Sequence, residues 1–159
     1  MSSSTTTRRP HTPVRTAALV VGAAFLLVGI AGFIPGLTTH VDMLTWAGHH
    51  SGSLLLGIFA VSVLHNVVHL VFGVAGLLSA RTFGGARIYL LAGGVIYLVL
   101  TVYGLVIDRS GAANFVPVNT ADNWLHLGLG AAMVALGVLL GRSGPQASTD
   151  PHQPTDGIE

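Results

Sequence analysis

Two short polar patterns interrupt an otherwise apolar sequence: His-Asn-x-x-His at residues 65–69 and Asp-Asn-x-x-His at residues 122–126. In each pattern the two titratable residues are four positions apart, so a helix places both on one face. Neutral imidazoles and a carboxylate are ligands that zinc and similar divalent metals accept. If the two helices face each other, the side chains of His65, His69, Asp122 and His126 converge into one polar cluster.

The main prediction for this cluster is a structural network, in which the side chains form hydrogen bonds between helices and cap helix N-termini. Asp122 would then lie in a first helical turn, where the helix dipole favours negative charge. An ionisable residue within a membrane span costs about 2.5–3.5 kcal/mol on insertion scales, so functional alternatives stay open. They are a divalent metal site, a small transporter, and a b-type haem with His69 and His126 as axial ligands. The residues that could capture or complete a metal site, and that otherwise belong to a solvated loop, are His40, Asp42, His49 and His50.

The composition places these patterns in a membrane protein. Of the 159 residues, 51% are hydrophobic and only 8% are charged, against about 25% charged in soluble domains. Four apolar segments have about the length that crosses a bilayer, at residues 17–34, 62–80, 88–107 and 121–140. We therefore predict an all-α, polytopic four-helix bundle over residues 16–141, embedded in the lipid bilayer, with disordered tails at residues 1–15 and 142–159.

Several function classes are excluded by residue type. Seven basic residues against six acidic ones give no field for neutralising the phosphates of a nucleic acid. The chain has no cysteine, which rules out disulfides and thiolate chemistry. The sequence also lacks a nucleophile-elbow pattern and a glycine-rich phosphate loop. We expect no enzymatic activity, while homo-oligomerisation and protein partners stay open.

The arginines predict the orientation. Six of the seven fall on one side of the predicted spans and one, Arg109, on the other; the six are Arg8, Arg9, Arg15, Arg81, Arg87 and Arg142. Because cytoplasmic loops are enriched in basic residues, both termini are expected in the cytoplasm of a multi-pass cell-membrane protein. The segments at residues 36–61 and 108–118 then face outward, with Trp46 and Trp124 as interfacial anchors.

The two halves of the sequence resemble each other. A shift of 72 residues places the first apolar segment on the third, and a shift of 57 places the second on the fourth. The matched pairs include Gly22 with Gly94, Phe25 with Tyr97, Gly32 with Gly104, Ser62 with Asn119, Asn66 with Asn123, His69 with His126, and Gly73 with Gly130. This pattern predicts a parallel repeat of two helical hairpins that pack through inward-facing glycine stripes.

The repeat also predicts where the second span begins. Pro117 precludes a helix just before Asn119, so the fourth span starts near that residue, which is a good N-cap. By equivalence the second span starts near Ser62. Residues 54–61 are then a connector in the outer interface.

Three stretches resemble a known family. They are Gly57-Ile-Phe-Ala-Val-Ser-Val-Leu-His-Asn-Val-Val-His-Leu-Val-Phe-Gly-Val-Ala-Gly76, Arg87-Ile-Tyr-Leu-Leu-Ala-Gly-Gly-Val-Ile-Tyr97, and Phe115-Val-Pro-Val-Asn-Thr-Ala-Asp-Asn-Trp-Leu-His126. Together they resemble an actinobacterial membrane family, domain of unknown function 4383, over about residues 15–141. The resemblance implies a four-span membrane protein and brings no activity, ligand or site residue. Ala60 stands where the family pattern leads us to expect proline.

Overall fold

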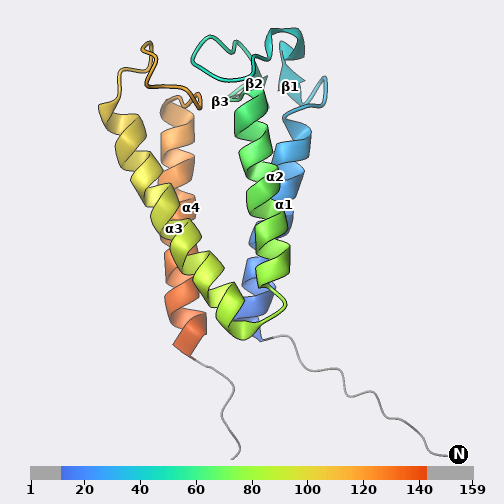
Figure 1. Ribbon diagram of the computed structural model, residues 1–159, viewed down its shortest axis with the longest axis vertical. Coiled ribbons are helices and arrows are strands. Elements are labelled where there is room, and N and C mark those ends of the chain that lie inside the picture. Colours follow the sequence, from blue (N-terminus) through green and yellow to red (C-terminus); the bar gives the residue numbers. More distant parts are fainter. Residues whose placement is uncertain (1–11, 143–159) are drawn as a thin grey trace, which may run out of the picture.

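Helices dominate the computed structural model of the chain, which describes residues 12–142 (Figure 1). The described part contains four α-helices: α1 Pro13–Ala31, α2 Val63–Ser79, α3 Phe83–Val106 and α4 Thr120–Leu139, the last extended by the 3-10 turn η2 Leu140–Arg142. This confirms the prediction of a mostly helical, four-helix structure. By length and composition α1, α3, and α4 with its 3-10 turn can each cross a membrane, whereas α2 is a shorter apolar helix of 17 residues.

Two helices begin earlier than the sequence suggested. The first starts at Pro13 instead of residue 17, because proline has no N–H to leave unpaired in a first turn. The third starts at Phe83 instead of residue 88, because the Thr82 hydroxyl accepts a hydrogen bond from the Gly85 amide at 3.0 Å and caps the helix. The tails predicted for residues 1–15 and 142–159 lie mostly outside the described residues.

The segment between α1 and α2, residues 32–62, is called connector 1 below. It holds a 3-10 turn, η1 Val41–Met43, and three two-residue strands: β1 Thr38–Thr39, β2 Leu54–Leu55 and β3 Phe59–Ala60. The strands form an antiparallel sheet in the order β1-β2-β3, with Thr38 opposite Leu55 and Leu54 opposite Ala60. The sequence analysis did not anticipate this sheet, since strands of two residues carry no hydrophobic periodicity.

The helices form two hairpins, α1 with α2 and α3 with α4 (Figure 1). Connector 1 and the segment between α3 and α4, residues 107–119 (connector 2), lie at one end of the bundle, the connector end. The α2–α3 loop and the first and last described residues lie at the opposite end. Helix α3 begins beside the end of α2 and leans away from it toward the connectors.

Each hairpin is closed by glycines that bring two backbones together. A Cβ atom added to Gly22 of α1 would lie 3.0 Å from the carbonyl oxygen of Gly73 and 2.9 Å from the Leu77 nitrogen. A Cβ atom added to Gly94 of α3 would lie 2.8 Å from the carbonyl oxygen of Gly130 and 2.9 Å from the Val134 nitrogen. Because backbone atoms cannot move aside as side chains can, no larger residue fits at either position.

Nearer the connectors, an asparagine fills the space beside a glycine in each hairpin. A Cβ atom on Gly32 would overlap the Asn66 side-chain oxygen, and one on Gly104 would overlap that of Asn123. Both asparagines are buried. The predicted inward glycine stripes are therefore filled by the neighbouring helix of the same hairpin.

Large apolar side chains cover the outward faces of the helices. Leu27 of α1, Val71 of α2, Val102 of α3 and Leu139 of α4 are each 60% or more exposed. The buried core is small and lies between the hairpins; it consists of Val14, Ala18, Phe25, Ala80, Ala86, Tyr89, Leu90, Tyr97 and Met133. Such an apolar exterior is far larger than soluble monomers tolerate.

We predict that Gly94→Ala destabilises the bundle by about 1–3 kcal/mol, because the added methyl group must push apart the backbones of α3 and α4. Gly128→Ala on α4 is the matched control, since its Cβ atom would meet no atom within 4 Å. Thermal unfolding in detergent should show a loss for the first variant and none for the second. Equal melting temperatures for both variants would contradict the close approach.

Candidate functional site

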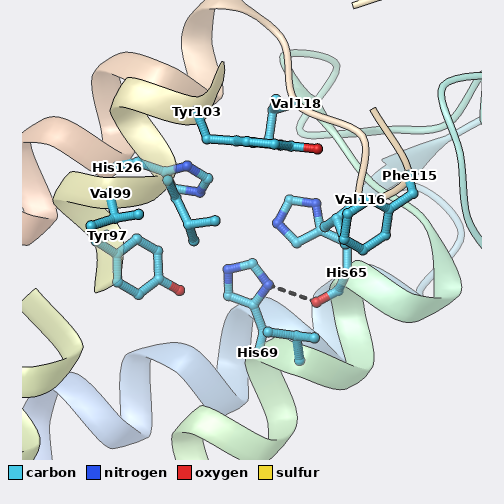
Figure 2. A pocket seen from close by; sticks show the side chains of 11 residues that line it. His65, His69, Tyr97, Val99, Tyr103, Phe115, Val116, Val118 and His126 are labelled. Carbon is cyan, nitrogen blue, oxygen red and sulfur yellow. Dashed lines mark hydrogen bonds between the residues drawn. The ribbon is translucent and has the colours of Figure 1, made fainter. Parts of the chain in front are cut away.

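The structure brings the four predicted site residues to the connector end of the bundle. His65 and His69 lie in the first two turns of α2, and Asp122 and His126 lie in the first two turns of α4. The ring centroids of His65 and His69 are 4.6 Å apart, and those of His65 and His126 are 6.4 Å apart. The three imidazoles therefore form one cluster across the two hairpins (Figure 2).

The N-caps expected at Ser62 and Asn119 are confirmed by hydrogen bonds. The Ser62 hydroxyl accepts from the His65 amide at 3.1 Å, and the Asn119 side-chain oxygen accepts from the Asp122 amide at 3.0 Å. The next donors of α2 are also satisfied, because the Val63 and Leu64 amides donate to carbonyl oxygens of connector 1. Helix α2 thus begins against a folded connector.

The hydrogen bonds of the Asp122 carboxylate go to backbone amides and not to the histidines. Its carboxylate oxygen Oδ2 accepts from the Asn119 amide at 2.8 Å, which completes a capping box, and from the Ala60 amide of β3 at 3.1 Å. The Asn119 side-chain amide in turn donates to the Ile58 carbonyl oxygen at 2.7 Å. The start of α4 is therefore fastened to connector 1, on the other hairpin.

The arrangement gives the metal hypothesis no support. Two backbone amides already occupy Oδ2 of Asp122. The rings of His65 and His69 stack on each other, with an interplanar angle of 20°. Among residues 12–142 no group of three or more His, Cys, Asp or Glu side chains is placed to hold a metal ion. The metal site stays a prediction.

The haem hypothesis needed room for a macrocycle along the glycine stripes. That room is taken up by backbone and asparagine contacts within each hairpin. Below the histidines, Phe25 and Tyr97 stack with ring centroids 5.4 Å apart, and Phe72 packs on both. The space between His69 and His126 is thus partly filled by aromatic rings.

Within the described part of the chain, the residues of connector 1 that were expected to assist a metal site form no metal-binding group with the cluster. His40 is in a left-handed conformation before η1, and its carbonyl oxygen accepts a hydrogen bond from the Ser53 hydroxyl at 2.7 Å. His49 and His50 pack against each other, with ring centroids 3.9 Å apart. Trp46 and Trp124 are each 68% exposed, as interfacial anchors would be.

The three histidines line a cavity of about 280 Å³ that the sequence analysis did not anticipate. Its wall comes from α2, α3, α4 and connector 2, and the other lining residues are Val68, Tyr97, Val99, Leu100, Tyr103, Phe115, Val116 and Val118. Figure 2 shows the imidazoles and the Tyr97 hydroxyl turned toward the same space. One feature of the sequence could have indicated Tyr97. The shift of 72 residues pairs it with Phe25, so the second half carries a hydroxyl group where the first half has a plain ring.

Comparison with known families now places the chain. A family described as domain of unknown function (DUF4383) matches residues 15–139. The chain belongs to this family. The match spans both hairpins of this DUF4383 protein, with the histidine cluster, Asp122 and the cavity inside it. No curated protein and no solved structure matches the chain.

We predict that Asp122→Ala weakens the connector end of the DUF4383 protein. The substitution removes the acceptor of the Ala60 and Asn119 amides, so the expected loss is about 1–3 kcal/mol, with faster hydrogen exchange at the Ala60 amide. Asp122→Asn, which keeps one acceptor oxygen, should lose less.

Asp108→Ala is the control for that experiment. Asp108 is exposed on connector 2, and the hydroxyl and amide of Ser110 lower the pKa of its carboxyl, so it is an ionised residue bonded within its own loop. Removing it should leave exchange at Ala60 unchanged. If both aspartate variants behaved alike, the fastening role of Asp122 would be wrong.

Proposed function

We propose that the chain is a four-span integral protein of the cell membrane, with both termini in the cytoplasm, and that it works as a non-enzymatic membrane component. In this proposal the polar cluster holds an ordered connector end at the outer membrane surface. The observation that carries it is the Asp122 carboxylate, which bonds the start of α4 to β3 of the other hairpin.

The order of the helices supports four spans. Helix α1 runs from the end of the bundle that holds the α2–α3 loop to the connector end, and α3 starts again at the end with the loop (Figure 1). If α1 and α3 cross the bilayer, α2 must cross it in the opposite direction. Its 17 residues lie at the lower limit for a span, and Val71, Val74 and Leu78 on its outward face are about half exposed or more.

The described arginines support the orientation. Arg15 at the start of α1 donates to the Ala80 carbonyl oxygen at the end of α2, at 2.9 Å. Arg81, Arg87 and Arg142 lie at the same end of the bundle, whereas Arg109 lies at the connector end and donates to the Thr120 hydroxyl. Basic residues gather on the cytoplasmic side of membrane proteins, which supports an outer position for the connector end.

Equivalent contacts in the two hairpins support the parallel repeat. Gly22 meets Gly73 and Leu77, and 72 and 57 residues further on Gly94 meets Gly130 and Val134. The Gly32–Asn66 contact corresponds in the same way to the Gly104–Asn123 contact. The helix-capping bonds of Ser62 and Asn119 follow the same shift.

We predict the topology from this arrangement. A reporter enzyme that is active only outside the cytoplasm should be silent when fused after Arg142 and active when inserted in residues 45–53, since the connectors face outward. A second fusion, within the loop at Ala80–Thr82, should also be silent. Activity at the loop and silence at the connector would reverse the proposed orientation, and activity at both would exclude four spans.

The structural role makes a prediction about metal. Added Zn²⁺ should leave the melting temperature of the untagged protein unchanged, whereas a bound metal would raise it in proportion to RT ln(1 + [L]/Kd). His69→Ala removes a ring that packs on Phe25 and bonds the His65 carbonyl oxygen of its own helix, so it should lower the melting temperature by the same amount with and without zinc. A zinc-dependent rise that disappears in His69→Ala would favour the metal site over the structural network.

A further inference from the structure

We propose that the cavity among α2, α3, α4 and connector 2 binds a small apolar molecule that carries a hydroxyl group, such as an alkylphenol, and that enters from the lipid. This site is distinct from the Asp122 fastening, because Asp122 does not line the cavity. It depends on the membrane embedding proposed above, and it is independent of the orientation.

The size and lining of the cavity define the body of the ligand. Its volume is about 280 Å³, and most of its wall is valine, leucine and aromatic carbon. An apolar cavity of about 150 Å³ is enough to bind benzene. The cavity therefore accommodates one aromatic ring with a short alkyl chain.

His69 defines the hydrogen-bonding end of the ligand. Its Nδ1 lies 3.0 Å from the carbonyl oxygen of His65, which can only accept, so Nδ1 carries the proton. In the neutral ring Nε2 is then an acceptor, and it requires a donor such as a hydroxyl group. The Tyr97 hydroxyl points into the same space and can donate to the ligand oxygen (Figure 2).

His65 and His126 add two further polar groups with no fixed role. Each is only 5% exposed, and each lines the cavity. Within the described residues the Nδ1 atom of neither ring has a hydrogen-bond partner. Because buried polar atoms are almost always bonded, the unpartnered Nδ1 of each ring can bond to a ligand, while the backbone of Ala60 and Pro117 also bonds the His65 ring.

The cavity opens on the outward face of α3. Val99 and Phe115 both line it, and they are 61% and 53% exposed. Val95 and Val102, one turn before and one turn after Val99, are also more than half exposed. This face is the apolar exterior that the lipid covers, so a ligand dissolved in the lipid reaches the histidines past Val99 and Phe115.

The test uses the whole chain in lipid nanodiscs and three probes with the same pentylphenyl body: 4-pentylphenol, 4-pentylanisole and pentylbenzene. Affinity is taken from the rise in melting temperature, with empty nanodiscs giving the free probe concentration. The phenol donates to His69 and the other two probes cannot. We expect it to bind about two- to twelvefold more tightly, the value of one net hydrogen bond.

Two variants locate the binding site. His69→Phe keeps the ring and removes the acceptor, so the phenol should lose its advantage while pentylbenzene binds as before. Val68→Phe fills the cavity and should weaken all three probes, whereas Val67→Phe, on the neighbouring residue that does not line the cavity, should weaken none. If His69→Phe does not melt cooperatively, Tyr97→Phe replaces it. Because this variant removes the donor to the ligand oxygen, it should weaken the phenol and the anisole and leave pentylbenzene unchanged.

Several outcomes would overturn the proposal. They are equal affinity for the three probes in the parent protein, an unchanged advantage of the phenol over pentylbenzene in His69→Phe or its replacement, and equal effects of Val67→Phe and Val68→Phe. Each of these would mean that the probes act through the lipid or the exposed helix faces. The topology reporters test the proposed membrane arrangement separately, so failure of one experiment does not decide the other.

Discussion

Contact between backbones at glycine holds each hairpin together, and the rest of the molecule depends on it. In lipid, apolar side chains gain little by leaving the hydrocarbon for each other, so helices associate through close packing of small residues and through polar contacts. At Gly22 and Gly94 the neighbouring backbone lies where a Cβ atom would be. Toward the connectors the space beside Gly32 and Gly104 widens enough to admit an asparagine side chain. The change from backbone contact to asparagine along each hairpin sets the register of its two helices. His65 and His126 both lie at the connector end.

The two similar hairpins use equivalent positions differently. At one pair of positions, His65 faces the cavity, while Asp122 turns to backbone amides and joins α4 to β3. At another, Phe25 packs as a plain ring, while Tyr97 adds a hydroxyl. The two hairpins thus supply both a fastening and a cavity, because each of these polar residues occurs in only one hairpin. The hydrogen bonds of Asp122 also hold the connectors in place beside the open end of the cavity.

Much of the fold could be predicted from the sequence, because membrane helices follow local rules. The lengths of the apolar segments predicted the four helices, and the capping side chains of Ser62 and Asn119 predicted the starts of α2 and α4. Local rules could not predict contacts between residues that are far apart in the sequence. The bond from Asp122 to the Ala60 amide joins residues 62 positions apart, and it depends on a sheet with strands too short to show a pattern. For the candidate site, spacing predicted which side chains would meet. It could not predict that Asp122 is occupied by amides, or that Tyr97 completes a cavity.

The cavity lies between the hairpins for a physical reason. At the glycine and asparagine contacts each hairpin is closely packed, whereas the cavity that the histidines line lies where α3 leans away from α2. Imidazoles placed in that opening have only partly satisfied hydrogen bonds, as the unpartnered Nδ1 atoms of His65 and His126 show. A membrane protein that needed only to hold its helices together would be better served by apolar side chains there, because an unpaired buried polar group costs stability. Three histidines and a tyrosine around one apolar space are therefore better explained by a molecule that pairs with them than by packing alone.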